Sequence, residues 1–357
     1  MQTHQLAQVT IDERPEKAEV EVKAEIPTER VALFRGKATV EISKDVSIDG
    51  FRKGNVPEAV LIKHVGESAI MERAASLGIS HELPLLLAEK QVLAIETPKV
   101  TITKLAPGNP IAFTALITVQ PEVTLPDYVK IAKKHVAKKE MPTVADDEVA
   151  DMTRYLRRER ARIDMVEKGE DAEKAYEKSQ GLTEDALPPI DDEFAKSLGA
   201  KDAVDLADRM KENMLTDKVR KAGEKVRLAI VEDIIAGSSM PLPGILVERE
   251  LDRMMHRFED DIIRGGSTLD AYLADAKKTR DDFRKEWREA AEKRAKMHLA
   301  MGKIAVTEKI DAPKDLVEHE IEHIMRHQPT ADIEEMRPYI ESAFMPEAVF
   351  RWLETQK

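Results

Sequence analysis

The spacing of apolar residues changes at Pro121, and this change constrains the fold more than any single motif. Before it, apolar and polar residues alternate over residues 20–26 and 111–119, which is the period of half-buried strands. Residues 28–90, between those strands, show helical spacing, as does the charged chain after Pro121. We therefore expect an α+β N-terminal domain with a helical insertion, followed by a mainly α-helical domain.

The composition agrees with long, solvated helices. Charged residues make up 35% of the 357 residues and aromatic residues 4%, and glycine is scarce at 15, which argues against a compact barrel. The absence of cysteine excludes disulfides, thiol nucleophiles and thiolate metal sites, and it fits a reducing compartment. The sequence shows neither a signal-peptide core nor a run of about 18 apolar residues that could span a membrane. We expect a cytosolic protein without a membrane partner.

The length predicts two or three domains, which we place at residues 1–120, 121–188 and 189–357. In the first, Gly78 is expected to end one helix before a second at 83–90. In the middle segment we expect a lone arm helix at 146–168 and then a linker or frayed helix up to Asp185. Other expected elements are strands at 92–95, 99–105 and 111–119 and C-terminal helices at 314–327, 333–344 and 347–353.

The loop at residues 50–57 has the sequence Gly-Phe-Arg-Lys-Gly-Asn-Val-Pro, which combines turn formers with two cations and an aromatic residue. Its glycines tolerate unusual backbone angles, and Pro57 presets its own φ to open a helix. Phe51 can then project as an apolar anchor while Arg52 and Lys53 meet phosphate or carboxylate. An ordinary interhelix turn is the alternative that composition alone leaves open.

The charge distribution sets this loop apart. The net charge is −12, and ten of the twelve excess negative charges lie after residue 118, whereas residues 28–64 hold seven cations against five anions. General nucleic-acid binding, including binding to DNA, is therefore not expected. Any contact with a polyanion would be local and would use this basic region.

The signature Gly-Phe-Arg-x-Gly-x-x-Pro between two helices resembles the ribosome-binding loop of bacterial trigger factor. Other similar segments follow along the chain: Pro121-Glu122-Val123, Leu187-Pro188-Pro189 with Glu193-Phe194, and Met240-Pro241-Leu242-Pro243 with Leu246 and Glu248. The resemblance implies that the loop docks on the large ribosomal subunit, on a ribosomal protein and rRNA near the exit tunnel. Asn55 stands where the family usually has lysine, which predicts weaker docking. The ribosome-binding residues so implied are Gly50, Phe51, Arg52, Lys53, Gly54 and Pro57.

The resemblance also implies a chaperone of unfolded or nascent polypeptides that uses neither ATP nor another cofactor. In most trigger factors a prolyl-isomerase domain of the FKBP type is inserted at the place that residues 167–185 occupy in this chain. These roughly 20 residues are too few to form even a small independent domain of about 50 residues. We therefore expect this domain and its enzymatic activity to be absent. A holdase that never visits ribosomes is the alternative that Asn55 allows, and the sequence leaves a homodimer open.

Methionine marks a candidate client surface. Thirteen of the fifteen methionines lie beyond residue 119, and their flexible, polarizable thioethers can adapt to many apolar shapes. The alternative is that most of these methionines fill the apolar cores between helices and do not contact clients. The candidate client-binding residues are Met210, Met214, Met254, Met255, Phe258, Met297 and Met301.

One motif suggests an enzyme instead. His319-Glu320-Ile321-Glu322-His323 satisfies H-E-x-x-H, which gives zinc two imidazoles and a catalytic carboxylate. On a helical wheel the histidines, with His327, lie roughly 125° from the apolar face, so we expect them on the solvated side. A zinc-dependent hydrolase using His319, Glu320 and His323 is therefore the less favoured alternative. No P-loop or G-x-G-x-x-G motif indicates a nucleotide.

Overall fold

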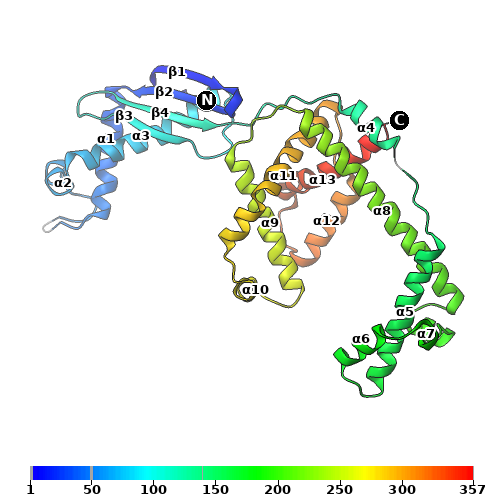
Figure 1. The fold of residues 1–357 in the computed structure, drawn as a ribbon. Helices are drawn as coiled ribbons and strands as arrows, with labels where there is room; N and C mark the ends of the chain where they lie inside the picture. Colours follow the sequence, from blue (N-terminus) through cyan, green and yellow to red (C-terminus); the bar gives the residue numbers. More distant parts are fainter. Residues whose placement is uncertain (1–2, 49–50, 139, 357) are drawn as a thin grey trace. The chain divides into compact units, whose positions relative to one another are not determined.

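The computed structural model describes residues 3–48, 51–138 and 140–356. Contacts between Cα atoms divide the chain into two units, Met1–Pro126 with Gly237–Lys309 and Asp127–Ala236 with Ile310–Lys357. The sheet formed by the described residues lies in the first unit, and helices make up most of the remaining elements (Figure 1). The expected α+β fold with a helical insertion, followed by a mainly helical chain, is confirmed. The domain boundaries expected at residues 120 and 188 stay predictions.

The first unit begins with a four-stranded antiparallel sheet of order β1-β2-β4-β3. Val22 pairs with Ala115, and Ile26 pairs with Ile111, across the two central strands. Alternate residues of β2 and β4 are buried, which confirms the expected period-two pattern. The strands are β1 (Ala7–Arg14), β2 (Glu19–Ile26), β3 (Lys99–Lys104) and β4 (Ile111–Thr118), and a 3₁₀ turn at Pro15–Lys17 joins the first two.

The strand expected at residues 92–95 is wrong, because this segment contributes an isolated bridge between Ala94 and Val119 instead. The backbone N–H of Val92 donates to the carbonyl oxygen of Leu87 at 2.9 Å. That bond ties the segment to the end of the preceding helix, so its backbone cannot extend along the sheet.

Three helices lie between β2 and β3 in the sequence, and the first and third of them cover one face of the sheet (Figure 1). Phe34 and Met71, from two of these helices, share the main core with Phe113 of β4, and all three side chains are at most 2% exposed. Burial of this apolar surface fixes the helices on the sheet. The helices are α1 (Thr28–Asp45), α2 (Glu58–Val65) and α3 (Glu67–Glu89).

Gly78 does not end a helix as expected, because α3 runs through it without a break. An ideal Cβ at Gly78 would lie 2.7 Å from Cδ1 of Ile26 and 3.1 Å from Cδ2 of Phe34. The missing side chain therefore lets α3 approach β2 and α1 closely. Gly78 is therefore explained by close packing of α3 and does not act as a signal that ends the helix.

The first unit also contains a helical hairpin, and an aromatic cluster joins its two long helices to the short helix between them. Phe258 lies against Tyr272, Phe283 and Trp287, with ring centroids 5.2–5.3 Å apart. Such contacts bury much apolar area and fix the loop of the hairpin. The helices are α9 (Gly244–Arg264), α10 (Leu269–Ala276) and α11 (Arg280–Glu308).

All regular elements among the described residues of the second unit are helices. Arg227 of its longest helix bonds Glu347 and Glu354 of the C-terminal helix, each with a contact of 2.7 Å. That C-terminal helix is continuous, so the expected break before Glu347 is wrong: Pro346 lies inside it and Val349 is fully buried beyond it. The longer helices are α4 (Tyr128–Val136), α5 (Asp146–Glu167), α8 (Ala203–Gly237), α12 (Lys314–His327) and α13 (Ile333–Glu354).

The middle segment forms a packed hairpin, so the expected lone arm helix followed by a linker or frayed helix is wrong. Residues 172–180 form the helix α6, which packs on α5 and buries Ala175 and Ser179 completely. Asp171 caps this helix by accepting the backbone N–H of Glu173 at 3.1 Å. Because charged residues dominate this segment, its sequence does not show that a few small residues are buried against α5. The pattern therefore does not predict a packed helix here. A 3₁₀ turn, Glu184–Ala186, and the helix α7 (Asp192–Ser197) follow.

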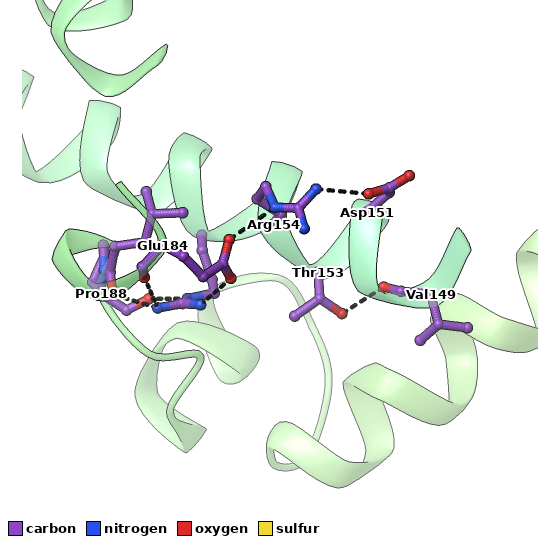
Figure 2. Close-up of polar contacts among 8 residues, drawn as sticks. Val149, Asp151, Thr153, Arg154, Glu184 and Pro188 are labelled. Atoms are coloured by element: carbon purple, nitrogen blue, oxygen red, sulfur yellow. Dashed lines mark hydrogen bonds and ion pairs between the residues drawn. The ribbon is translucent and has the colours of Figure 1, made fainter. Parts of the chain in front are cut away.

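Arginines of α5 hold the chain that returns from this hairpin (Figure 2). Arg154 donates to a carboxylate oxygen of Glu184 at 2.8 Å. Arg157 donates to the other oxygen at 2.7 Å and to the carbonyl oxygens of Leu187 and Pro188 at 2.6 and 3.0 Å. A fork-shaped guanidinium can satisfy several acceptors at once, so Arg157 fixes an irregular segment that has no ladder partner.

Candidate functional site

The loop between α1 and α2 folds into a tight, hydrogen-bonded tip. Phe51 donates its backbone N–H to Ile48 at 3.1 Å, and Asn55 donates to Arg52 at 3.0 Å. Gly54 has φ of +87°, a value that glycine adopts without strain. Gly50, which the sequence also predicts for this site, lies outside the described residues. We call residues 51–57 the docking tip.

The docking tip presents its three candidate contact residues to solvent. The Phe51 residue is 40% exposed, although a large aromatic group is normally mostly buried. Arg52 and Lys53 are exposed, and among the described residues no ion pair engages either of them. An aromatic ring beside two unpaired cations is suited to a surface that offers both an apolar recess and negative charge.

A small apolar cluster beneath the docking tip supports it. Val56, Leu61 and Ile70 are at most 7% exposed, and partly buried residues of α1 and the loop surround them. Pro57 lies at the N-cap of α2, where its carbonyl oxygen accepts the N–H of Leu61 at 3.0 Å. Sequence reasoning treated Val56 as a spacer in the signature. Its apolar character, next to Pro57, was the signal that it anchors the turn.

Arg35 of α1 ties this helix to the N-terminal ends of both following helices. Its guanidinium bonds Glu58 of α2 at 2.7 Å and Glu67 of α3. The hydrogen bond to Glu67, followed by that to Glu58, raises the pKa of Arg35 further above its ordinary value despite partial burial. Arg35 therefore stays charged, and it holds the middle of α1 to the first residues of α2 and α3.

The predicted client-binding residues fall into two groups. Met255 and Met301 are 6% and 0% exposed, and Met255 belongs to the apolar core of the α9–α11 hairpin. Met254 and Phe258 are partly buried against the same hairpin. Met210, Met214 and Met297 are partly buried as well, so five of the seven residues keep a solvent-facing part.

The histidine motif lies on the solvated face of α12, as expected. His319 and His323 are exposed, while Val317 and Ile321 on the other face are at most 9% exposed. The rings of His323 and His327 lie 4.7 Å apart. In the part of the chain that the structure describes, no group of three or more His, Asp or Glu side chains is placed to hold a metal ion.

No helix among the described residues is both long enough and apolar enough to cross a membrane.

Comparison with known proteins gives matches over most of the chain. The family model for bacterial trigger factor protein matches residues 7–156, and the model for the trigger factor C-terminus matches residues 204–352. The trigger factor of Moorella thermoacetica is 25% identical over 88% of this chain and 86% of its own. That of Carboxydothermus hydrogenoformans is 25% identical over 90% of this chain and 92% of its own.

A solved structure shares the fold. It comes from work on promiscuous substrate recognition in the folding and assembly activities of the trigger factor chaperone. The two chains superpose with a TM-score of 0.53 and 17% identity, over 98% of this chain and 100% of the other. Together the two family models span well over half of this sequence, so the chain belongs to the bacterial trigger factor family.

Proposed function

We propose that this trigger factor is an ATP-independent chaperone that docks on the large ribosomal subunit and shields nascent polypeptides in the cytoplasm. The observation that carries the proposal is the docking tip, where an exposed Phe51 stands beside the unpaired cations Arg52 and Lys53 on a fixed turn. Family membership supports the same function.

Docking requires a partner with two kinds of surface. Phe51 needs an apolar recess, which a ribosomal protein supplies. Arg52 and Lys53 need carboxylates or phosphates, which the protein and the adjacent rRNA supply. Asn55 is exposed and adds no charge, so the tip carries one cation fewer than the usual family signature. We therefore propose the same location of docking with a lower affinity.

Client binding uses the solvent-facing apolar groups of the helical region. Met210 and Met214 lie on α8, and Leu215 and Val219 of the same helix are 41% and 39% exposed. Scattered apolar groups among charges favour weak contacts at several positions over one tight site, and weak contacts let a client leave as it folds. The buried Met255 and Met301 are outside this proposal.

We also propose that the chain lacks prolyl-isomerase activity. The family models leave residues 157–203 unmatched, and there the chain forms the second half of α5 with α6 and α7. The alignment with the Moorella relative runs over 389 positions but includes 88% of this 357-residue chain, about 314 residues, so roughly 75 positions of the relative have no counterpart here. A proline-containing tetrapeptide assay tests this, because turnover at the level of an FKBP domain would show that the activity is present.

Two measurements on the full chain test the proposed function. Purified vacant ribosomes should carry the wild type through a sucrose cushion, and they should leave behind the triple variant Phe51→Ala, Arg52→Ala, Lys53→Ala. Both proteins should suppress aggregation of a chemically denatured client without nucleotide. Equal sedimentation of the two proteins would disprove the role of the tip, and lack of protection by the wild type would disprove the chaperone role.

The same pair of measurements separates the alternatives. A holdase that never visits ribosomes would protect the client while neither protein sediments. A zinc-dependent hydrolase would instead show peptidase activity that Glu320→Gln abolishes. The exposed histidines on an open helix face favour neither zinc chemistry nor a substrate cleft.

A further inference from the structure

Helix α1 leaves two large aliphatic side chains uncovered on its outer face. Leu33 and Val40 are 48% and 49% exposed, whereas Phe34 and Ala38, on the inner face, are at most 2% exposed. Because seven residues make close to two helical turns, Leu33 and Val40 lie one above the other on the same face. They border a shallow groove of about 500 Å³, lined by Leu33, Gly36, Lys37, Val40, Glu41 and Lys44. We call this surface the α1 groove.

Gly36 forms part of the floor of the α1 groove, and folding gives no reason for a glycine there. It lies in the interior of α1, where glycine weakens a helix relative to alanine. An ideal Cβ at Gly36 would meet no other atom within 4 Å, in contrast with Gly78. A side chain would fit in the free protein. The glycine instead leaves the helix backbone open to close approach by a partner.

The charges around the α1 groove select an acidic partner. Glu41 is already neutralised by Arg73, whose guanidinium lies 2.7 Å away. Lys37 lies over the Phe34 ring at 5.4 Å, and Lys44 has no ion pair with any residue that the structure describes. Two cations therefore remain against one paired anion. A carboxylate on the partner would find complementary charge at this face.

The α1 groove is continuous with the docking tip. Gly54 of the tip donates its N–H to the carbonyl oxygen of Ser43 at 2.8 Å. An ideal Cβ on Gly54 would lie 3.5 Å from Cγ of Lys44, which lines the end of the groove. A partner that engages the tip can thus extend along α1 without a gap.

We propose that the α1 groove is a second ribosome contact, which takes an apolar segment flanked by carboxylates from a protein of the large subunit. This inference rests on the proposed function of the docking tip. A protein fits better than rRNA, because Leu33 and Val40 are aliphatic and offer bases no aromatic ring on which to stack. An open glycine floor likewise suits a packed protein segment.

The test measures equilibrium binding of the full chain to purified vacant ribosomes. Leu33→Ser with Val40→Ser should weaken binding roughly tenfold, in line with loss of two apolar anchors at an interface. Gly36→Gln should weaken it several-fold while thermal stability stays at or above that of the wild type, because glutamine favours helix and fills the floor. Leu93→Ser, which alters another exposed aliphatic residue of the same unit, is the control and should bind normally.

Photocrosslinking identifies the occupant directly. With p-benzoyl-phenylalanine in place of Val40, the crosslink on purified ribosomes should join to a large-subunit protein. Crosslinking to rRNA, or to a second copy of the chain, would overturn the proposal. Unchanged ribosome affinity in both groove variants would also overturn it, as would a loss of client protection without a loss of ribosome affinity. Normal ribosome binding by the docking-tip triple variant would disprove the proposed function of the tip, and this outcome is distinct from normal binding by the two groove variants.

Discussion

The ion pair between Arg30 and Glu82 is the contact whose loss we expect to affect the N-terminal domain most. Glu82 lies on α3 and is fully buried, and Arg30 of α1 donates to it from Nε at 3.1 Å and also from Nη2. The backbone N–H of Gln5 donates to the other carboxylate oxygen at 2.8 Å. Arg30→Ala would leave a buried carboxylate with the Gln5 amide and His81, whose Nδ1 lies 3.3 Å away, as its remaining partners.

The expected cost follows from this burial. Removing one member of a buried ion pair costs about 3–5 kcal/mol. The Arg30 side chain is 23% exposed, which places the estimate at the lower end, about 3 kcal/mol. Because about 1.4 kcal/mol corresponds to a factor of ten, the population of opened molecules should rise roughly a hundredfold.

The pKa of Glu82 sets the pH range of this effect. Burial acts to raise the pKa, but the hydrogen bonds from Arg30 and the Gln5 amide outweigh burial and bring it below its ordinary value. A lowered folded-state pKa means that the pair contributes its full stability above the ordinary Glu value, near pH 4.5, and loses it as pH falls through the folded-state pKa. The difference between wild type and Arg30→Ala should therefore shrink in acid.

Amide hydrogen exchange of the full chain, followed by mass spectrometry, measures the effect where it occurs. Peptides from α3 and β4 should exchange roughly a hundredfold faster in Arg30→Ala at neutral pH, while peptides from α12 stay unchanged. Arg73→Ala is the matched control, because it breaks another α1–α3 ion pair whose side chains are 48% and 41% exposed, and it should change the rates by less than threefold. An Arg30→Ala effect no larger than that of the control would refute the reasoning.

Two further predictions concern packing and acid stability. Gly78→Ala should destabilise the protein by about 1–3 kcal/mol, because the new methyl group would clash with Ile26. Gly36→Ala should stabilise it by up to about 1 kcal/mol, because the new methyl group meets no other atom and alanine favours helix. Equal midpoints of thermal unfolding for the two variants would contradict both predictions. The Arg160 side chain, helped by a backbone N–H, lowers the pKa of Asp191 to about 2, so the Arg160–Asp191 bond contributes fully above the ordinary Asp pKa of 3.8 and disappears as pH falls through about 2. An NMR titration of the Asp191 carboxyl with a midpoint near 4 would show that this bond does not form in solution.

The sequence predicts those parts of the fold that local pattern determines. Alternation along residues 20–26 shows which side chains face the core, because strand geometry fixes the faces. The turn of the docking tip follows in the same way from Gly54 and Pro57, whose backbone preferences are intrinsic. The exposed position of the histidines follows from the helical period of α12.

The parts that sequence reasoning missed depend on distant partners. Gly78 looks like a helix stop until the Ile26 methyl group beside it is known, and nothing within α3 contains that information. Arg157 looks like one of many surface cations, yet its guanidinium fixes the carbonyl groups of residues about 30 positions away. For the same reason, Met255 and Met301 could not be separated from the solvent-facing methionines by sequence alone.

The central claim is that the docking tip brings this chain to the ribosome, and the dissociation constant of the full chain on vacant ribosomes tests it most directly. Anchors of this kind each contribute on the order of 1–2 kcal/mol at an interface, so Phe51→Ala, Arg52→Ala, Lys53→Ala together should weaken binding at least a hundredfold at physiological salt. A triple variant that binds within twofold of the wild type would contradict the account.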